Sequence, residues 1–388
     1  MWFLSIYFLL SFLGIYVLLL GDIQFHRNGI VGRLNRYLRS GLVSDIQKIV
    51  DSCPGPIKST LQCYIACFTS RHPLFLGMYI ALVLGGYIIF LLRGLHHIPG
   101  PILGESHRII PHLYITATFC WFIYVIRSDP GTIRSDNLKV HLERYPYDNI
   151  LYRPRFCKIC QIPRPARSRH CNSCKRCVSR FDHHCPWING DIGADNQWKF
   201  VVFLMNTGCL CMYCFMVCFG ILWGYILDQG YWHTGFVKPD GTVIQMGILL
   251  IIQFMARFDP WLFLLMCFTF VVSLVVFSFS LLQFSQALRN KTAVEVLKMN
   301  TLKNYIASKS NSVSIAELFS FIDTQSSPPD PEDKAQLDQY EKQYIYVFKQ
   351  TEPVTKQNLL NIYDNGIHSN FIELFTSTTP FQSKNKLS

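Results

Sequence analysis

Long apolar runs alternate with polar segments along this chain. Five runs reach the roughly 20 residues that a helix needs to cross the hydrocarbon core of a membrane. We expect spans at Trp2–Leu20, Leu74–Leu92, Ile109–Ile126, Phe200–Leu227 and Phe258–Phe284. The first run has no basic segment before it and no clear cleavage site, so an uncleaved anchor is expected rather than a secretory signal. The pattern predicts an α-helical multi-pass membrane protein.

One further apolar stretch, Val243–Arg257, is short for a span. We interpret it as a re-entrant or interfacial segment, and six spans remain the alternative to five.

The distribution of Lys and Arg predicts the orientation of the spans. Residues 21–73 carry seven and residues 127–199 carry fourteen of these residues, whereas 94–108 and 228–257 carry very few. Basic loops favour the cytosolic side, so the N-terminus is expected in the lumen and the tail from Ser285 in the cytosol. This bias accounts for much of the net charge of +11 without nucleic acid. A nucleic-acid binder is disfavoured, since no finger with recognition-helix spacing occurs.

Four regions follow from this topology. Residues 1–126 hold the first three transmembrane helices with a cytosolic loop at 21–73, and residues 127–199 form a cytosolic cysteine-rich zinc domain between helices three and four. Residues 200–284 hold helices four and five, and residues 285–388 form a cytosolic tail. Within the tail, 326–334 and 376–388 have linker-like composition.

The segment 157–185 holds six of the fifteen cysteines. Its spacing is Cys157-x2-Cys160-x9-His170-Cys171-x2-Cys174-x2-Cys177-x6-His184-Cys185. Paired cysteines followed by a histidine are typical of tetrahedral zinc sites, and the repeat indicates two of them. Disulfides are the rival explanation, but they suit secreted domains rather than a basic cytosolic segment. A polar segment without an apolar core needs such metal to fold.

The run Asp182-His183-His184-Cys185 places a thiol beside two imidazoles and a carboxylate. A thiolate nucleophile, a histidine base and a carboxylate that orients the base are a common acyl-transfer arrangement. Cys185, His183 and Asp182 suit these roles, and the spacing of His184 suits a metal ligand. However, two tetrahedral sites need eight ligands, and residues 157–184 supply seven without Cys185. Spacing alone therefore leaves Cys185 open as nucleophile or ligand, with Asp191 as the next ligand candidate.

Residues 157–196 resemble the DHHC cysteine-rich domain of protein S-palmitoyltransferases. The resemblance rests on Arg164-Pro165-x-Arg167-x-x-His170-Cys171, on Asp182-His183-His184-Cys185-Pro186-Trp187-Ile188-Asn189 and on Ile192-Gly193-x-x-Asn196. Outside this domain, Asp129-Pro130-Gly131, Thr292-x-x-Glu295 and Asn361-x4-Gly366-x3-Asn370 with Tyr363 resemble the family's DPG, TTxE and C-terminal elements.

The resemblance implies an enzyme that takes a long-chain acyl group from acyl-CoA onto Cys185, with His183 as base and Asp182 as its orienter. It also implies two structural zinc ions in an interleaved order. The first set is Cys157, Cys160, His170 and Cys177, and the second is Cys171, Cys174, His184 and Asp191.

The chain departs from the family pattern at two positions. Asp191 stands where the family usually has Cys, and an oxygen ligand there would be harder than a thiolate. If Asp191 did not bind, Cys185 could be recruited as the ligand, and a catalytically inactive membrane zinc scaffold is the alternative function. Ala293 stands where the TTxE element has its second Thr, which puts the role of that hydroxyl in doubt.

Within the family, Tyr145-Pro146-Tyr147-Asp148 and Asn361-Ile362-Tyr363-Asp364 look most like the fungal SWF branch. That branch implies an endoplasmic-reticulum enzyme whose substrates are membrane proteins, SNAREs among them, with cysteines beside the cytosolic face. Cys53, Cys63 and Cys67 are expected to be acylated or simply buried.

Overall fold

The computed structural model describes residues 29–37, 42–60, 62, 73–148, 150–232, 236–237, 239–244, 247–309, 312–324, 354–355, 361 and 363–375. The chain divides into two units, residues 1–70 and 71–388. In the first unit, α2 (Ile30–Arg36) and α3 (Leu42–Ser52) are short helices, and Val50 is buried. Cys53 is half-buried in this unit, and Cys63 and Cys67 lie outside the described residues.

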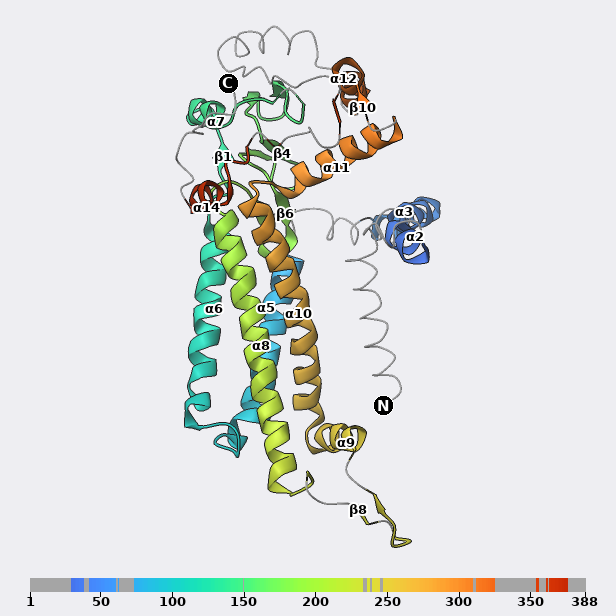
Figure 1. Cartoon of the computed structure of the whole chain (residues 1–388), viewed down its shortest axis with the longest axis vertical. Helices are drawn as coiled ribbons and strands as arrows, with labels where there is room; N and C mark the ends of the chain where they lie inside the picture. Colours follow the sequence, from blue (N-terminus) through green and yellow to red (C-terminus); the bar gives the residue numbers. More distant parts are fainter. Residues whose placement is uncertain are drawn as a thin grey trace. The chain divides into compact units, whose positions relative to one another are not determined.

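Four helices of the second unit are long and apolar enough to cross a membrane (Figure 1). They are Leu74–His97, Ile110–Arg127 (α6), Gln197–Asp228 (α8) and Pro260–Leu288 (α10). The first consists of α5 (Leu74–Ile89), a π-helical turn η2 (Phe90–Gly94) and a 3-10 turn η3 (Leu95–His97). These helices confirm four of the five predicted spans, while the predicted span Trp2–Leu20 lies outside the described residues. The cysteine-rich segment therefore lies between the second and third of the four.

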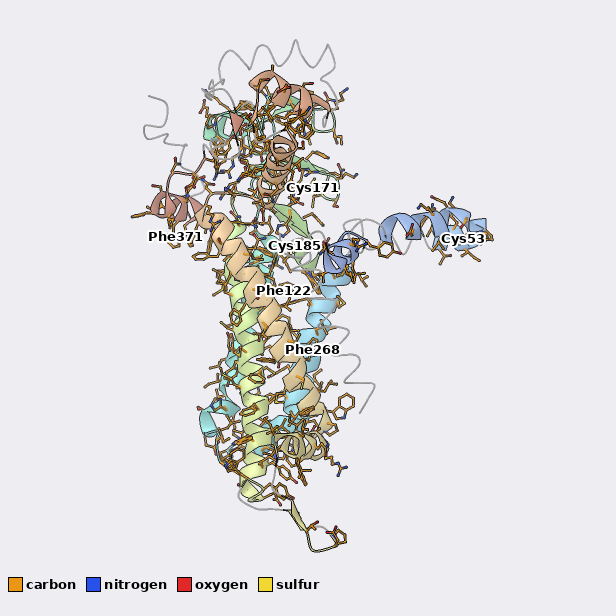
Figure 2. All side chains as sticks on the ribbon, turned by 45° about the vertical axis from the view of Figure 1, so that its right-hand side comes forward. Cys53, Phe122, Cys171, Cys185, Phe268 and Phe371 are labelled. Carbon is orange, nitrogen blue, oxygen red and sulfur yellow. The ribbon has the colours of Figure 1, made fainter. Side chains whose placement is uncertain are left out.

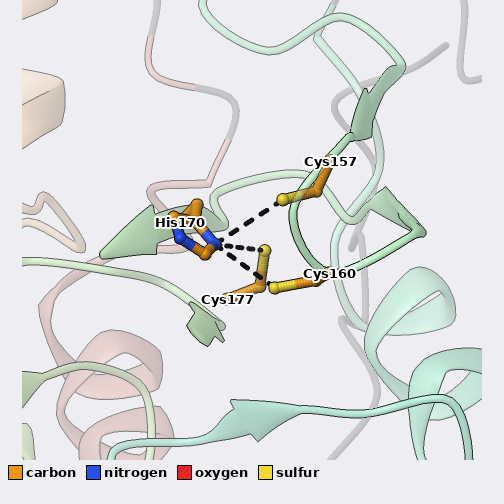
Figure 3. Close-up of side chains that lie close together, drawn as sticks. All are labelled: Cys157, Cys160, His170 and Cys177. Atoms are coloured by element: carbon orange, nitrogen blue, oxygen red, sulfur yellow. Dashed lines mark hydrogen bonds between the residues drawn. The ribbon is translucent and has the colours of Figure 1, made fainter. Parts of the chain in front are cut away.

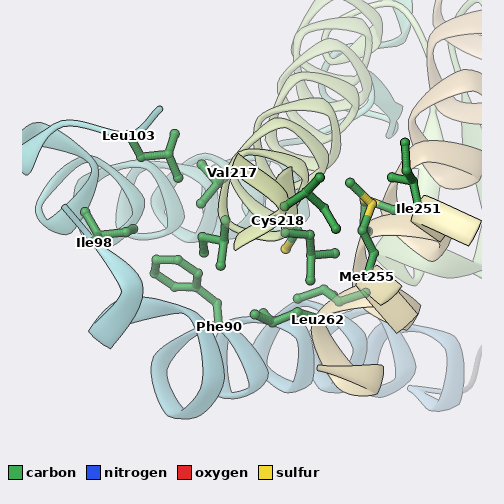
Figure 4. Packing of buried hydrophobic residues seen from close by; sticks show 13 residues of the cluster. Phe90, Ile98, Leu103, Val217, Cys218, Ile251, Met255 and Leu262 are labelled. Atoms are coloured by element: carbon green, nitrogen blue, oxygen red, sulfur yellow. The ribbon is translucent and has the colours of Figure 1, made fainter. Parts of the chain in front are cut away.

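The four helices pack through small and apolar side chains. Gly208 on α8 faces the ring of Phe277 on α10, where an added Cβ would come within 3.1 Å of the ring. At the end away from the cysteine-rich segment, a cluster that includes Phe90, Val217 and Leu262 joins three of the helices (Figure 4). Such close side-chain packing holds apolar helices together where lipid tails remove the hydrophobic driving force between helices.

At the same end, α9 (Ile248–Phe258) follows a small hairpin of β8 (Phe236–Val237) and β9 (Val243–Ile244). Eleven residues of helix extend only about 16 Å, because the rise is about 1.5 Å per residue. The helix is too short to cross a bilayer, so α9 agrees with the prediction of a non-spanning segment. Asp259 then caps α10 by accepting from Trp261 N and Leu262 N, and it pairs with Arg93 at 2.8 Å.

Between α6 and α8 the chain folds into short antiparallel strands joined by tight turns. A short helix, α7 (Leu138–Arg144), and a 3-10 turn, η5 (Pro186–Ile188), lie among them, and another 3-10 turn, η4 (Glu105–Arg108), precedes α6. The strands form the three-stranded sheet β1 (Thr132–Ile133), β5 (Arg176–Val178) and β4 (Arg169–Cys171), and the hairpins β2 (Arg155–Cys157) with β3 (Ile162–Arg164) and β6 (His183–Cys185) with β7 (Gly190–Ile192). We call residues 129–196 the cysteine-rich domain.

The turn after α6 attaches this domain to the helices. Asp129 accepts from the backbone N–H of Gly131 and Thr132 and from the Thr132 hydroxyl, which fixes the start of β1. Gly193 lies against Pro130 O, Val178 and Ser179 O so closely that a Cβ could not fit. This close approach explains why a glycine is required at that position.

After α10, the tail returns to the cysteine-rich domain. Helix α11 (Ala293–Ser308) begins with a capping box in which Thr292 and Glu295 satisfy each other's backbone N–H groups. Helix α12 (Ile315–Thr324) packs on α11, β10 (Ser312–Val313) pairs with β11 (Val354–Thr355), and α14 (Ile367–Phe375) packs on α10 and α8. The predicted linker-like segments 326–334 and 376–388 lie outside the described residues.

Arg167 joins these distant segments. Its side chain is 0% exposed and donates to both carboxylate oxygens of Glu295, at 2.7 and 2.9 Å. It also donates to the side chain and backbone oxygens of Asn290. The guanidinium lies between the rings of Tyr145 and Tyr363, 4.8 and 4.5 Å from their centroids. One side chain thus links the cysteine-rich domain, α11 and the C-terminal segment.

We predict that Glu295→Ala strongly destabilises the junction. Removing one partner of a buried ion pair leaves the other charge uncompensated and costs about 3–5 kcal/mol. The measurement is the thermal unfolding midpoint of the purified full-length protein in detergent. Glu105→Ala is the control, because Glu105 pairs with Arg108 at 3.4 Å on the exposed surface. Equal midpoints for both variants would contradict the role assigned to the Arg167–Glu295 pair.

Candidate functional site

Two turns of the same shape present the first cysteines of each cluster. In one, Gln161 N donates to Cys157 O, and in the other Lys175 N donates to Cys171 O, both at 2.8 Å. Gln161 and Lys175 both have a positive φ, 55° and 54°. The shared geometry follows from the shared Cys-x2-Cys spacing and turns each pair of sulfurs to one side.

In the first cluster, three sulfurs converge on one imidazole (Figure 3). The distances from His170 Nδ1 to the Sγ atoms of Cys157, Cys160 and Cys177 are 3.6, 3.2 and 3.8 Å. Strand pairing places His170 opposite Cys177, and the turn after β2 brings the other two sulfurs.

The second cluster has two sulfurs, one imidazole and one carboxylate. His184 Nδ1 lies 3.8 and 3.5 Å from the Sγ atoms of Cys171 and Cys174 and 2.9 Å from Asp191 Oδ1. Asp191 faces His184 because these two residues are paired across the β6–β7 hairpin.

Both clusters fit tetrahedral zinc. Metal–ligand bonds of about 2.0–2.3 Å arranged tetrahedrally place neighbouring ligand atoms about 3.3–3.8 Å apart. The nitrogen–sulfur separations of 3.2–3.8 Å match this range, and the His184–Asp191 separation of 2.9 Å is shorter. In each cluster all four ligand atoms lie within 4.8 Å of one another, and Asp191 belongs to the second group. The described cysteines are all free, so the disulfide alternative finds no support in this part of the chain.

The alternation of strand β6 separates two kinds of chemistry. Successive side chains of a strand point to opposite faces. His184 therefore points to the second cluster, while His183 and Cys185 share the other face. Cys185 is not part of either four-residue group.

Asp182 fixes the orientation of the His183 ring through a hydrogen bond. His183 Nδ1 lies 2.8 Å from Asp182 Oδ2. Burial disfavours the charged imidazole, but hydrogen bonds to Asp182 and Cys185 outweigh it and raise the pKa of His183 to about 10. A protonated His183 beside Cys185 stabilises negative charge on the Cys185 sulfur.

Asp182 is in turn held by the first turn of α11. Its Oδ1 accepts a hydrogen bond from Ala293 N, and N–H groups at a helix N-terminus favour an anion. This hydrogen bond does not depend on the Ala293 side chain, which is where the residue departs from the family motif. The backbone supplies the donor at this position.

Cys185 lies where the cysteine-rich domain meets the membrane helices. It is 5% exposed and belongs to an apolar cluster with residues of α5, α6 and α8. Figure 2 shows Cys185 between Cys171 in the cysteine-rich domain and Phe122 on α6. The buried members of the cluster are Tyr79, Phe122, Val125, Cys185, Ile188, Ile192, Phe200, Phe203 and Leu204.

A basic cavity of about 460 Å³ opens between the cysteine-rich domain and helices α11 and α12. Its cationic lining residues are Arg153, Arg155, Arg164, Arg167, Arg169 and Lys298. Arg164 Nε is buried without a hydrogen-bond partner. Phe181 and Val294, which also line the cavity, are the chain neighbours of Asp182 and Ala293, so the cavity adjoins the segment that leads into β6.

The structure brings the predicted ligand residues together in two clusters and places Asp182, His183 and Cys185 beside the second of them. The sequence did not identify the basic cavity or the central position of Arg167. The sequence feature that could have indicated the cavity is the number of arginines in 153–169. However, these arginines meet Lys298 only through a contact between segments far apart in the chain.

Comparison with known proteins agrees with this geometry. Residues 150–300 match the family model for DHHC palmitoyltransferase. Palmitoyltransferase swf1 of Schizosaccharomyces pombe is 30% identical over 204 residues, which cover 50% of this chain and 55% of that protein. Palmitoyltransferase ZDHHC4 of Rattus norvegicus is 25% identical over 229 residues, covering 59% and 67%.

Palmitoyltransferase SWF1 of Saccharomyces cerevisiae is 47% identical over a shorter stretch of 79 residues, covering 19% of this chain and 24% of that protein. The match to the first relative thus spans about half of its length. The match to the DHHC palmitoyltransferase family model runs without interruption through both four-residue clusters, strand β6 and the first turn of α11, so residues 150–300 resemble that family throughout the candidate site.

Proposed function

We propose that this protein is a protein S-palmitoyltransferase that carries the acyl group on Cys185. The observation that carries the proposal is the placement of Cys185. It shares a strand face with a histidine held by a carboxylate, and it is packed against apolar side chains of membrane-crossing helices. A long acyl chain can therefore lie among the helices while its thioester meets the sulfur.

The proposed reaction has two thioester exchanges. The Cys185 thiolate attacks the acyl carbonyl carbon of acyl-CoA, the bond to the CoA sulfur breaks, and His183 gives a proton to the departing thiolate. A substrate thiol then loses its proton to His183 and attacks the acyl carbon, the bond from that carbon to the Cys185 sulfur breaks, and Cys185 is released as the thiolate. Asp182 acts as a positioning residue, because it orients the His183 ring.

Two zinc ions are proposed as structural. One would be held by Cys157, Cys160, His170 and Cys177 and the other by Cys171, Cys174, His184 and Asp191. When bound, zinc supplies the stability that this small polar domain lacks. The second set keeps His184 on the face of β6 opposite Cys185, so the metal fixes the strand that carries the nucleophile.

The basic cavity is the proposed site for the phosphates of CoA. Arginine side chains suit phosphate through bidentate hydrogen bonds, and the cavity adjoins the segment that leads into β6. Its volume and charge favour a large anionic headgroup over a small apolar ligand.

The substrates and location proposed for the protein rest on the resemblance of its motifs to the fungal SWF branch and on the distribution of charge. We propose that the cysteine-rich domain and the tail from Ser285 face the cytosol, with regions divided at residues 126, 199 and 284. Membrane proteins with cysteines near that face, SNAREs in particular, are the proposed substrates, and the endoplasmic reticulum is the proposed location. The alternative of an inactive zinc scaffold is disfavoured because Cys185 lies outside both metal clusters.

We expect wild-type protein in membranes to take up label from an alkyne palmitoyl-CoA in a hydroxylamine-sensitive bond. Cys185→Ser should abolish this label, because an alkoxide nucleophile is poorly populated at neutral pH and would give a hydroxylamine-resistant ester. Cys120→Ser, which changes an exposed cysteine of α6, is the control and should retain the label. Persistence of wild-type labelling in folded Cys185→Ser would contradict Cys185 as the carrier.

We expect the purified protein to contain two zinc ions per chain. Asp191→Ala should lower the content to about one, because it removes one of four ligands from the second cluster. Asp228→Ala, at the far end of α8, serves as the control and should retain two. The measurement is metal content by mass spectrometry against protein concentration, and an unchanged content in Asp191→Ala would argue against a carboxylate ligand.

We expect the KM for palmitoyl-CoA to rise as pH increases through about 8. Burial lowers the pKa of Lys298 to about 8, against the opposing charges of Asp148 and Glu295. The cavity therefore holds the Lys298 charge below this pH and loses it above. Lys298→Arg keeps its charge throughout, so its KM should stay flat from pH 7 to 9. Parallel pH profiles for the two proteins would contradict a role for Lys298 in binding CoA.

A further inference from the structure

The two oxygens of Asp191 have different surroundings. Oδ1 lies 2.9 Å from His184 Nδ1, on the side of the Cys171 and Cys174 sulfurs. Oδ2 accepts a hydrogen bond from Arg176 Nε at 3.3 Å. The Asp191 side chain is 0% exposed, so neither oxygen reaches water.

A carboxylate raises a difficulty that a thiolate would not. A cysteine offers a single ligand atom, whereas an aspartate that contributes one oxygen to a four-ligand site leaves the other oxygen free. A buried acceptor without a donor costs about 1–3 kcal/mol, and more when it is charged. The second oxygen of Asp191 therefore needs a donor inside the protein.

Arg176 is placed to be that donor by the same strands that build the clusters. It lies on β5, paired with Cys171 of the second cluster and next to Cys177 of the first. Its side chain is 31% exposed, so its charge keeps some contact with water while its Nε points inward. Asn196 Nδ2 donates to Asp191 O, which holds the backbone of the same residue.

The net charge of the second cluster also supports a role for Arg176 at this site. Two thiolates and a carboxylate bring three negative charges to the second cluster, one more than a divalent zinc ion neutralises. The guanidinium of Arg176 supplies the missing positive charge, beside an oxygen that water does not reach. Groups that hydrogen-bond to metal ligands commonly tune metal affinity in this way.

We propose that Arg176 is the positioning residue that allows aspartate to replace cysteine at the second zinc site. It holds Oδ2 so that Oδ1 alone faces the cluster. The inference rests on the second zinc site proposed above and not on acyl transfer. Its failure is therefore separable from a failure of the proposed activity.

The test is the rate at which the two zinc ions of the purified full-length protein pass to a colorimetric chelator in detergent. Four proteins are compared: wild type, Arg176→Ala, Asp191→Cys and the double variant Asp191→Cys/Arg176→Ala. Self-acylation is measured on the same samples as a separate readout.

We expect Arg176→Ala to speed the release of one of the two zinc ions by about 10- to 100-fold, the usual effect of losing an outer-shell partner. In the Asp191→Cys background the same change should have a clearly smaller effect, because a thiolate has no second oxygen to satisfy and only the neutralising charge of Arg176 is lost. Arg176→Gln, which can still donate an N–H without a charge, should fall between Arg176→Ala and wild type. Lys139→Ala, which removes an exposed charge on α7, is the control and should release zinc as wild type does.

The positive charge of Arg176 also interacts with the negative charge of the Asp129 carboxylate, whose hydrogen bonds form the turn after α6. A role confined to that turn would make Arg176→Ala equally harmful in both backgrounds, and this outcome would overturn the proposal. Wild-type zinc release from Arg176→Ala would overturn it as well. If Arg176→Ala does not fold, recovery of folding in the double variant supports the proposal, and failure to fold in both contradicts it.

Discussion

The buried pair between Arg167 and Glu295 is the interaction on which the arrangement of the active region depends. Arg167 belongs to the cysteine-rich domain, and Glu295 caps the helix that follows the last membrane helix. A charge with no exposed surface must be fully paired, so the two segments can meet in only one register. The C-terminal segment joins them, because Asn290 Nδ2 donates to Tyr363 O and to Glu373.

The pairing of Arg167 with Glu295 affects the proposed catalytic residues through the first turn of α11. Glu295 fixes that turn, and Ala293 N then donates to Asp182, which holds His183. The tail therefore contributes to the orientation of the proposed base without lying in the same domain. The same junction forms one wall of the basic cavity, since Arg167 and Lys298 both line it.

A second constraint is the two-residue period of strand β6. Because of this period, the His184 side chain points to the second cluster, whereas the side chains of His183 and Cys185 point toward the membrane helices. Four consecutive residues thus contribute to both the proposed metal site and the proposed reactive site. Replacement of the fourth ligand by Asp191 preserves this division, provided that Arg176 satisfies the oxygen left over.

Much of the site follows from local sequence. The Cys-x2-Cys spacing specifies two turns of the same shape and indicates two metal sites, while the interleaved order of the two clusters was implied by the family resemblance. Apolar runs likewise predict the four described membrane helices, because a span depends on length and hydropathy alone.

The sequence also singled out Asp191 and Ala293 as departures, but it left the effect of each open. Only the tertiary structure shows that the Ala293 backbone holds Asp182 and that Arg176 pairs with Asp191. Likewise, only the tertiary structure places Arg167 at the contact between the cysteine-rich domain, α11 and the C-terminal segment, and brings the neighbouring arginines and Lys298 to one cavity. The physical reason is that turns and spans are decided within a few residues or one helix length. A buried charge and its partners come instead from segments more than a hundred residues apart, and no local pattern records that they meet.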